Sequence, residues 1–348
     1  MKIILRSGAV TAAVGVGLSL AVLPAVPATA AAGGTHVRCN DIAALKAAIN
    51  NANTNGGRIT LASRCTYTLT AADNADDGLP EITGNVTISG RDTTIRRASN
   101  ATADFRILHV VSGGSLTLNS LTVSGGNPAN GSDGGGIANE NGTLNLHRTT
   151  IRGNQAEMGG GLYNTGGRLN LDHSTVERNT STLWGGGVYN TGSGTLTMKG
   201  GALLKNRALD NGGGLENING AANLHSVSVR GNTALQGGGI RQTLGATLRL
   251  TSSRVSDNIA VSGAGISNNN STATLVRSLV TNNTAITTGG GIVNENTGQV
   301  TLTASRVIRN APDNCAPAGS VPGCTNPTST IAPPTAQLPP ASGDTAPQ

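Results

Sequence analysis

The sequence predicts an all-β fold, a parallel β-helix of about ten turns with one short helix capping its N-terminal end. Three observations predict this fold: a glycine triplet that returns every 25 to 27 residues, short runs of alternating aliphatic residues between the triplets, and a shortage of aromatic residues. The chain has 348 residues, of which 50 are Gly and only five are Phe, Trp or Tyr. A compact core draws much of its buried area from aromatic side chains, so a thin, stacked, aliphatic core is the better expectation.

The first thirty residues have the pattern of a secretory signal peptide. Lys2 and Arg6 precede an uncharged apolar run over residues 8–23, and Ala28-Thr29-Ala30 fits a small-residue cleavage site. The rest of the chain contains no apolar stretch long enough to cross a membrane. We therefore expect a secreted, extracellular protein with no integral membrane span in its mature chain.

The charge pattern gives no indication of nucleic-acid binding. The formal net charge is +6, from 24 Lys and Arg against 18 Asp and Glu, and removing Lys2 and Arg6 leaves 22 against 18, or +4. The basic residues are scattered along the chain and no nucleic-acid-binding motif is present. This is the pattern of a solvated surface.

The four cysteines predict disulfides, because an even number in an exported chain is typical of cross-linked proteins. Cys39, Cys65, Cys315 and Cys324 allow three pairings. The favoured pairing is Cys39 with Cys65 and Cys315 with Cys324, since each bond closes a short loop at one end of the repeat region. The spacing does not match a zinc site.

Composition divides the mature chain into three parts. Residues 31–58 form an N-terminal cap, within which residues 41–53 have the apolar spacing of an amphipathic helix that would protect the open end of a sheet. Residues 59–310 form the parallel β-helix. Residues 311–348 form a Cys-containing segment followed by a Pro-rich tail that we expect to be disordered.

One repeated pattern reads Gly-Gly-Gly-aliphatic-x-Asn, with Ala in the middle of one triplet. Its last position holds six Asn and one Gln: Asn139, Asn164, Asn190, Asn217, Gln242, Asn268 and Asn294. Glycine permits positive φ and close approach of backbones, so a turn is expected at each triplet.

A second pattern, in phase with the first, reads aliphatic-x-aliphatic, then an aliphatic residue five positions later, then Asn three after that. The Asn residues are Asn154, Asn179, Asn206, Asn232, Asn258, Asn283 and Asn310. The aliphatic spacing predicts three short strands in each period. Stacked Asn side chains can hydrogen-bond to one another and to the backbone, so both Asn columns are interpreted as structural ladders.

The paired motifs GGG-I-x-N and V/I-x-x-N resemble the polymorphic outer-membrane-protein repeats that occur on right-handed parallel β-helices of the pectin-lyase-like superfamily. The resemblance covers about residues 82–310, with two departures. The second motif of that family usually begins with Phe, where this chain has Ile, Val or Leu, and the outer-membrane members end in a translocating barrel that this sequence does not predict, so we expect a freely secreted protein. The superfamily includes lyases, hydrolases and adhesins, so the resemblance implies a fold and leaves the chemistry open.

Candidate catalytic residues are few. Paired carboxylates on adjacent turns would lie about 5 Å apart, near the spacing of a retaining glycosidase. Asp133 and Glu157 come closest, but an offset of one residue would turn one side chain to the opposite face. His147, Asp172, Lys199 and His225 share one outward position on four successive turns, which favours a solvent-exposed ladder of mixed charge. No metal site and no cofactor are expected.

The aromatic residues suggest binding. Tyr163 and Tyr189 share a position on adjacent turns, and Trp184 precedes the triplet that leads to Tyr189. Sugar rings stack on such side chains. We therefore expect a monomeric, non-catalytic interaction protein, adhesin-like or binding a polysaccharide or cell-surface glycan. The alternative is a polysaccharide lyase or glycoside hydrolase, which would need several acids or bases converging in a groove.

Overall fold

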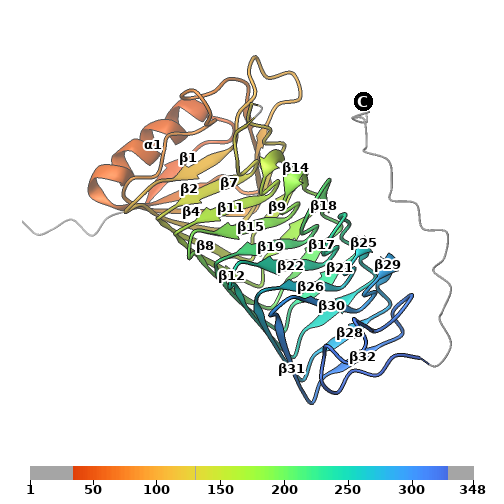
Figure 1. Ribbon diagram of the computed structural model, residues 1–348. Coiled ribbons are helices and arrows are strands. Elements are labelled where there is room, and N and C mark those ends of the chain that lie inside the picture. The colour runs from red at the N-terminus through yellow and green to blue at the C-terminus, as the bar shows by residue number, and fades with distance from the viewer. Residues whose placement is uncertain (1–33, 130, 328–348) are drawn as a thin grey trace, which may run out of the picture. The chain divides into compact units, whose positions relative to one another are not determined.

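A computed structural model of the protein describes residues 34–129 and 131–327. They form an all-β parallel β-helix of about 11 turns with a single helix near its N-terminal end, as the sequence predicts (Figure 1). The expected signal peptide, residues 1–30, and nearly all of the expected Pro-rich tail lie outside the described residues.

The first stack of strands gives the number of turns. Each strand pairs in parallel with the next turn's equivalent. The stack runs through β1 (Thr35–Val37), β2 (Gly57–Leu61), β4 (Asn85–Arg97), β6 (Ser115–Ser124), β8 (Thr143–His147), β12 (Arg168–Asp172), β16 (Thr195–Lys199), β20 (Ala221–His225), β23 (Thr247–Thr251), β27 (Thr272–Val276) and β31 (Gln299–Thr303). The sequence predicted about ten turns because it placed residues 35–37 in the cap, whereas the structure pairs them as a first strand.

A second stack continues the same sheet around a bend. It contains β3 (Thr66–Leu69), the C-terminal halves of β4 and β6, β9 (Thr150–Arg152), β13 (Thr175–Glu177), β17 (Ala202–Leu204), β21 (Ser228–Arg230), β24 (Arg254–Ser256), β28 (Leu279–Thr281) and β32 (Arg306–Ile308). The bend between the two strands of a turn often contains one residue in the left-handed backbone conformation, for example Arg148 with φ 47° or His173 with φ 48°. The prediction of three strands per period is therefore wrong for the regular turns, because this residue divides one expected segment into two strands.

The remaining strands form a short stack and a long one. The short stack contains β10 (Gln155–Met158), β14 (Thr180–Trp184) and β18 (Arg207–Ala208), and a separate pair contains β25 (Ile259–Ser262) and β29 (Thr284–Thr288). The long stack contains β5 (Leu108–Val110), β7 (Ile137–Glu140), β11 (Leu162–Thr165), β15 (Val188–Thr191), β19 (Leu215–Ile218), β22 (Ile240–Thr243), β26 (Ile266–Asn269), β30 (Ile292–Glu295) and β33 (Cys315–Ala316).

The glycine triplets connect these two stacks, and the last glycine of each triplet leaves no room for a Cβ atom. A Cβ atom at Gly187 would lie 2.5 Å from the carbonyl oxygen of Gly214 on the next turn. The turns are too close together at this last position for a side chain, whereas the middle position accepts Ala264 in one triplet.

The interior combines aliphatic stacks with buried amides. Leu144, Leu169 and Leu196 are fully buried at one position on successive turns. Asn154 donates from both its backbone nitrogen and its Nδ2 to Oδ1 of Asn179, at 3.0 Å each. The same pattern continues turn by turn, so the amides satisfy one another and the backbone without water.

The N-terminal end of the β-helix is capped by a helix. Helix α1 (Ile42–Asn55) begins after Asp41, whose side chain accepts a hydrogen bond of 2.9 Å from the backbone nitrogen of Ala44. The helix lies beside the first strands of the β-helix (Figure 1). Its buried residues, which include Leu45 and Ile49, belong to the same core as the first turns.

Disulfides lie at both ends. Cys39 bonds to Cys65 and Cys315 bonds to Cys324, which is the pairing that the sequence favoured. No helix within the described residues is both long and apolar enough to cross a membrane.

Candidate functional site

An aromatic stack contains Tyr163 and Tyr189 from β11 and β15 of the long stack and Trp184 from the end of β14 in the short stack. The Tyr163 and Tyr189 rings are stacked with centroids 5.4 Å apart and planes at 12°, and the Trp184 and Tyr189 rings are stacked at 6.1 Å and 19°. The parallel register pairs Tyr163 with Tyr189, Tyr189 with Glu216 and Glu216 with Arg241. These five residues form the surface that we call the aromatic strip.

The three rings differ in exposure. Tyr189 is only 5% exposed because its ring lies between the other two. Tyr163 and Trp184 are half-buried, so each has part of its surface open to solvent. The indole Nε1 of Trp184 donates a hydrogen bond of 2.9 Å to Oδ2 of Asp210 on the next turn. The stack is therefore held in one orientation before any ligand binds.

A buried ion pair continues the strip. Glu216 is fully buried, and Arg241 donates a hydrogen bond of 2.7 Å from Nη1 to its Oε1. Among the described residues, Oε2 of Glu216 has no hydrogen-bond partner. Burial raises the pKa of Glu216 to about 7, and the Arg241 charge offsets only part of that effect.

Asp133 lies near the aromatic strip, and the pKa of its carboxyl group is raised above the ordinary value for Asp. Burial raises its pKa to about 6, and the hydrogen bond of 3.1 Å that it accepts from the backbone nitrogen of Met158 opposes this shift. The negative charge of Glu157 raises the pKa further, so the two candidate acids lie within electrostatic range. Glu157 itself lines a separate cavity of about 160 Å³. Neither residue has been shown to act in catalysis, so both remain predictions.

A larger polar cavity lies beside the cap, in the irregular first turns. Its volume is about 830 Å³, and its lining includes Asp77, Glu81, Arg106, His109 and Glu140. The sequence analysis missed this site because these residues precede the regular repeats. The sequence does carry one indication of the site. If the repeat is extended toward the N-terminus, residues 108–110 align with residues 137–139, and His109 takes the same outward position as Tyr163.

Ionic contacts connect the residues of this cavity. Arg106 Nε lies 3.2 Å from Oδ1 of Asp77, which is only 2% exposed. His109 Nδ1 lies 3.5 Å from Oδ2 of Asp77 and 3.8 Å from Oε1 of Glu81. His109 Nε2 lies 3.5 Å from Oε1 of Glu140. Several acids and a histidine therefore converge here, which is the arrangement that stacking of the regular turns does not supply.

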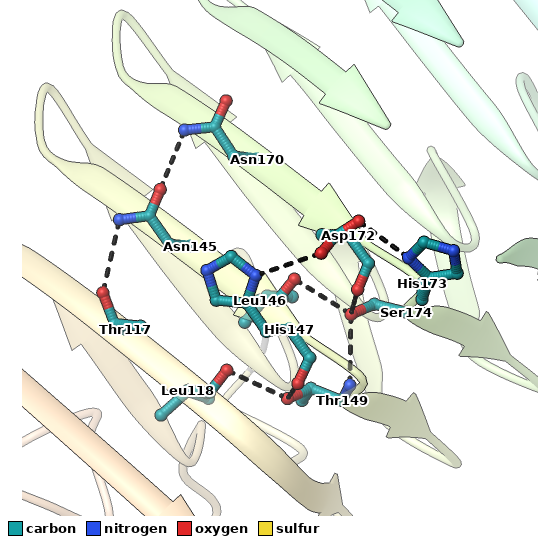
Figure 2. A network of polar contacts seen from close by, with 10 residues as sticks. All are labelled: Thr117, Leu118, Asn145, Leu146, His147, Thr149, Asn170, Asp172, His173 and Ser174. Atoms are coloured by element: carbon teal, nitrogen blue, oxygen red, sulfur yellow. Dashed lines mark hydrogen bonds and ion pairs between the residues drawn. The ribbon is translucent and has the colours of Figure 1, made fainter. Parts of the chain in front are cut away.

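The predicted outward ladder is solvent-exposed. His147 Nδ1 lies 3.5 Å from Oδ2 of Asp172, and His173 Nδ1 lies 2.8 Å from Oδ1 of the same carboxylate (Figure 2). The side chains of His147 and Asp172 are 46% and 47% exposed. The hydrogen bond from His173 is the main reason that the pKa of Asp172 is lowered. The register continues this column through Lys199 and His225.

Comparison with known proteins found no matching family model, no matching curated protein and no matching solved structure. The fold is thus supported by the structure, while membership of the pectin-lyase-like superfamily and the likeness to polymorphic outer-membrane-protein repeats stay predictions from the sequence.

Proposed function

We propose that the protein is a secreted, monomeric, non-catalytic β-helix that binds a polysaccharide or cell-surface glycan through the aromatic strip. The observation that carries this proposal is the three-ring stack of Tyr163, Tyr189 and Trp184, fixed by the hydrogen bond from Trp184 to Asp210. A rigid stack with two partly open rings loses little conformational entropy when a ligand binds.

The chemistry of the strip suits a carbohydrate. The apolar faces of sugar rings pack on aromatic side chains, while their hydroxyl groups need hydrogen-bonding partners nearby. Asp210 supplies an acceptor beside the Trp184 ring, and Arg241 supplies donors two turns from Tyr189 on the same outward column. The described part of the chain offers no clustered basic surface motif that would favour nucleic acid instead.

Two features support export. The chain carries two disulfides, which persist in oxidising compartments. Its first thirty residues have the composition of a signal peptide. A glycan outside the cell is the partner that these features favour.

The test is binding of the mature chain to a panel of soluble and insoluble polysaccharides, measured by calorimetry and by sedimentation. W184A is expected to weaken binding about tenfold, which corresponds to about 1.4 kcal/mol. The matched control is L183A, since Leu183 is exposed on the same strand β14 and is the adjacent residue. Circular dichroism would establish that both variants are folded. Equal affinity of W184A and the wild type would contradict the proposal.

A polysaccharide lyase or hydrolase is the second candidate, and one observation favours it. Asp133, with its pKa raised to about 6, can hold a proton near neutral pH, and Glu140 of the polar cavity lies within its electrostatic range. Assays for reducing ends and for unsaturated products would distinguish the two functions. Turnover that is abolished in D133N or E157Q would replace the binding proposal, whereas glycan binding without turnover would support it.

A further inference from the structure

We infer that the polar cavity beside the cap binds a divalent first-row transition metal of the Zn²⁺ class, with Asp77, Glu81 and His109 as ligands. One ligand atom from each residue lies within 4.8 Å of the other two. This inference is independent of glycan binding, because no residue of the aromatic strip takes part.

The spacing of the donor atoms fits coordination better than hydrogen bonding. The separations of 3.5 Å and 3.8 Å from His109 Nδ1 to the two carboxylates are long for N–H···O hydrogen bonds. Tetrahedral ligands with bonds of about 2.1 Å are about 3.4 Å apart. A metal ion at the centre of this group would therefore need only small side-chain movements.

The proposed ligands His109 and Asp77 have polar partners of their own, of the kind that orient metal ligands. Glu140 Oε1 lies 3.5 Å from His109 Nε2, which has no hydrogen-bond partner among the described residues. A small movement of Glu140 would let it accept the ring proton of Nε2 and leave Nδ1 free to coordinate. Arg106 approaches the second oxygen of Asp77, and Asn74 donates a hydrogen bond of 2.9 Å to Oδ2 of Asp77. These partners fix the orientation of the imidazole and of the buried carboxylate.

The local charge also favours a cation. Among the described residues that line the cavity, five are acidic and one is Arg or Lys: Asp73, Asp76, Asp77, Glu81 and Glu140 against Arg106. Asp77 is almost completely buried, so its charge is poorly solvated. Lys46 pairs with Asp73, and Arg106 contacts both Asp76 and Asp77, so part of this charge is already compensated. A divalent ion would compensate for the negative charge that remains.

The backbone around the ligands is held in place. Ile82, which follows Glu81, donates from its nitrogen to the carbonyl of His109 at 2.8 Å, and Gly78, which follows Asp77, donates to the carbonyl of Arg106 at 2.8 Å. The loop carrying both carboxylates is thus bonded directly to the segment carrying the imidazole. Three protein ligands beside an open cavity leave a coordination position for solvent or an anionic group.

The donor set predicts which ion binds. Imidazole nitrogen with carboxylate oxygen suits Zn²⁺, whereas Ca²⁺ takes six to eight oxygen ligands. The experiment uses the untagged mature protein, stripped with a chelator and titrated with Zn²⁺ and separately with Ca²⁺ by calorimetry. We expect one equivalent of Zn²⁺ to bind and Ca²⁺ to bind far more weakly.

Variants assign the site. H109A and E81Q should each weaken Zn²⁺ binding by more than about 100-fold, and E140A by about tenfold, the range of an outer-shell partner. E81Q is the safest substitution because the Glu81 side chain is 47% exposed. The matched control is H147A, which removes an exposed histidine that also lies 3.5 Å from a carboxylate, and it should bind Zn²⁺ like the wild type.

Three results would overturn the inference: no stoichiometric Zn²⁺ binding, tighter binding of Ca²⁺ than of Zn²⁺, or unchanged binding in both H109A and E81Q. The first would indicate that Asp77, Glu81 and His109 make only the direct ionic contacts described above. Thermal unfolding in the presence of chelator would show that each variant is folded without the metal.

Discussion

Trp184 is fixed by Asp210, which lies on the following turn and accepts a hydrogen bond of 2.9 Å from the indole Nε1. The carboxylate is itself oriented, because Asn211 donates to the same Oδ2 at 3.1 Å and Leu235 donates to the backbone carbonyl of Asp210 at 2.7 Å. The orientation of the half-buried indole therefore depends on two neighbouring turns, as well as on its own strand.

Removing this hydrogen bond should loosen the ring stack. We expect D210A to lower the free energy of unfolding by about 1.5–3 kcal/mol, the range for hydrogen bonds to charged groups, and to weaken glycan binding several-fold. Trp184 is the only Trp in the chain, so its fluorescence reports directly on this site. D210N keeps an acceptor oxygen and should restore the emission of the wild type. Unchanged emission in D210A would show that stacking alone orients the ring.

Glu216 should make stability depend on pH. Its pKa is raised to about 7 in the folded protein, from an ordinary value of 4.5, so the folded state retains a proton that the unfolded chain loses. This contribution is complete below about pH 4.5 and is lost as the pH rises to about 7. The free energy of unfolding should therefore decline over that interval, and E216Q should flatten the decline. Urea unfolding at several pH values measures it.

A second group contributes to the same decline. The pKa of Asp133 is raised to about 6, so part of the pH dependence persists in E216Q and should disappear in the double variant with D133N. Curves for the wild type and E216Q that run parallel between pH 4.5 and 7 would rule out the raised pKa of Glu216.

The amide ladder should contribute strongly to stability. Asn206 accepts hydrogen bonds from the backbone nitrogen and Nδ2 of Asn179, and it donates to the carbonyl of Val176 and to Asn232. N206A would leave several buried groups unpaired, each at a cost of about 1–3 kcal/mol. The control N223A removes an exposed Asn and should change stability by less than about 0.5 kcal/mol. Similar unfolding midpoints for the two variants would contradict a structural role for the ladder.

The two disulfides should stabilise the protein unequally. Cys39 and Cys65 are separated by 26 residues, and Cys315 and Cys324 by 9. Loop-closure entropy predicts that replacing both cysteines by Ser costs about 3.5 kcal/mol for the first pair and about 2.6 kcal/mol for the second. Equilibrium unfolding of the two double variants measures the difference. A reversed order would mean that native contacts at the ends outweigh the entropy of the unfolded chain.

The sequence predicted those parts of the molecule that repeat. Equal spacing placed Tyr163 opposite Tyr189 and His147 opposite Asp172, because a parallel register aligns residues one period apart. The bends within the large sheet were not predictable in this way. They depend on single residues with positive φ, such as Arg148 and His173, whose side chains give no sign of that conformation.

Two parts of the candidate site were missed for different reasons. The polar cavity is built from irregular turns, where Asp77 and His109 are brought together by loop contacts that no repeat encodes. The pairing of Glu216 with Arg241 does follow the period, since the two residues lie at one position on adjacent turns. A search for paired acids alone could not find it, because the partner carries the opposite charge.

The buried amides form one hydrogen-bonded chain, in which each Asn donates to the Asn of the turn that follows it. Each Asn from Asn154 onward passes its hydrogen bonds to the next turn, until Asn310 bonds to Asn314 and Asn314 bonds to Asn326 beside the C-terminal disulfide. A complete turn could be duplicated or deleted between the two ends without leaving any amide unpaired, whereas a partial turn could not. The number of turns, and with it the length of every outward face, is therefore free to vary in evolution or in engineering while both ends stay the same.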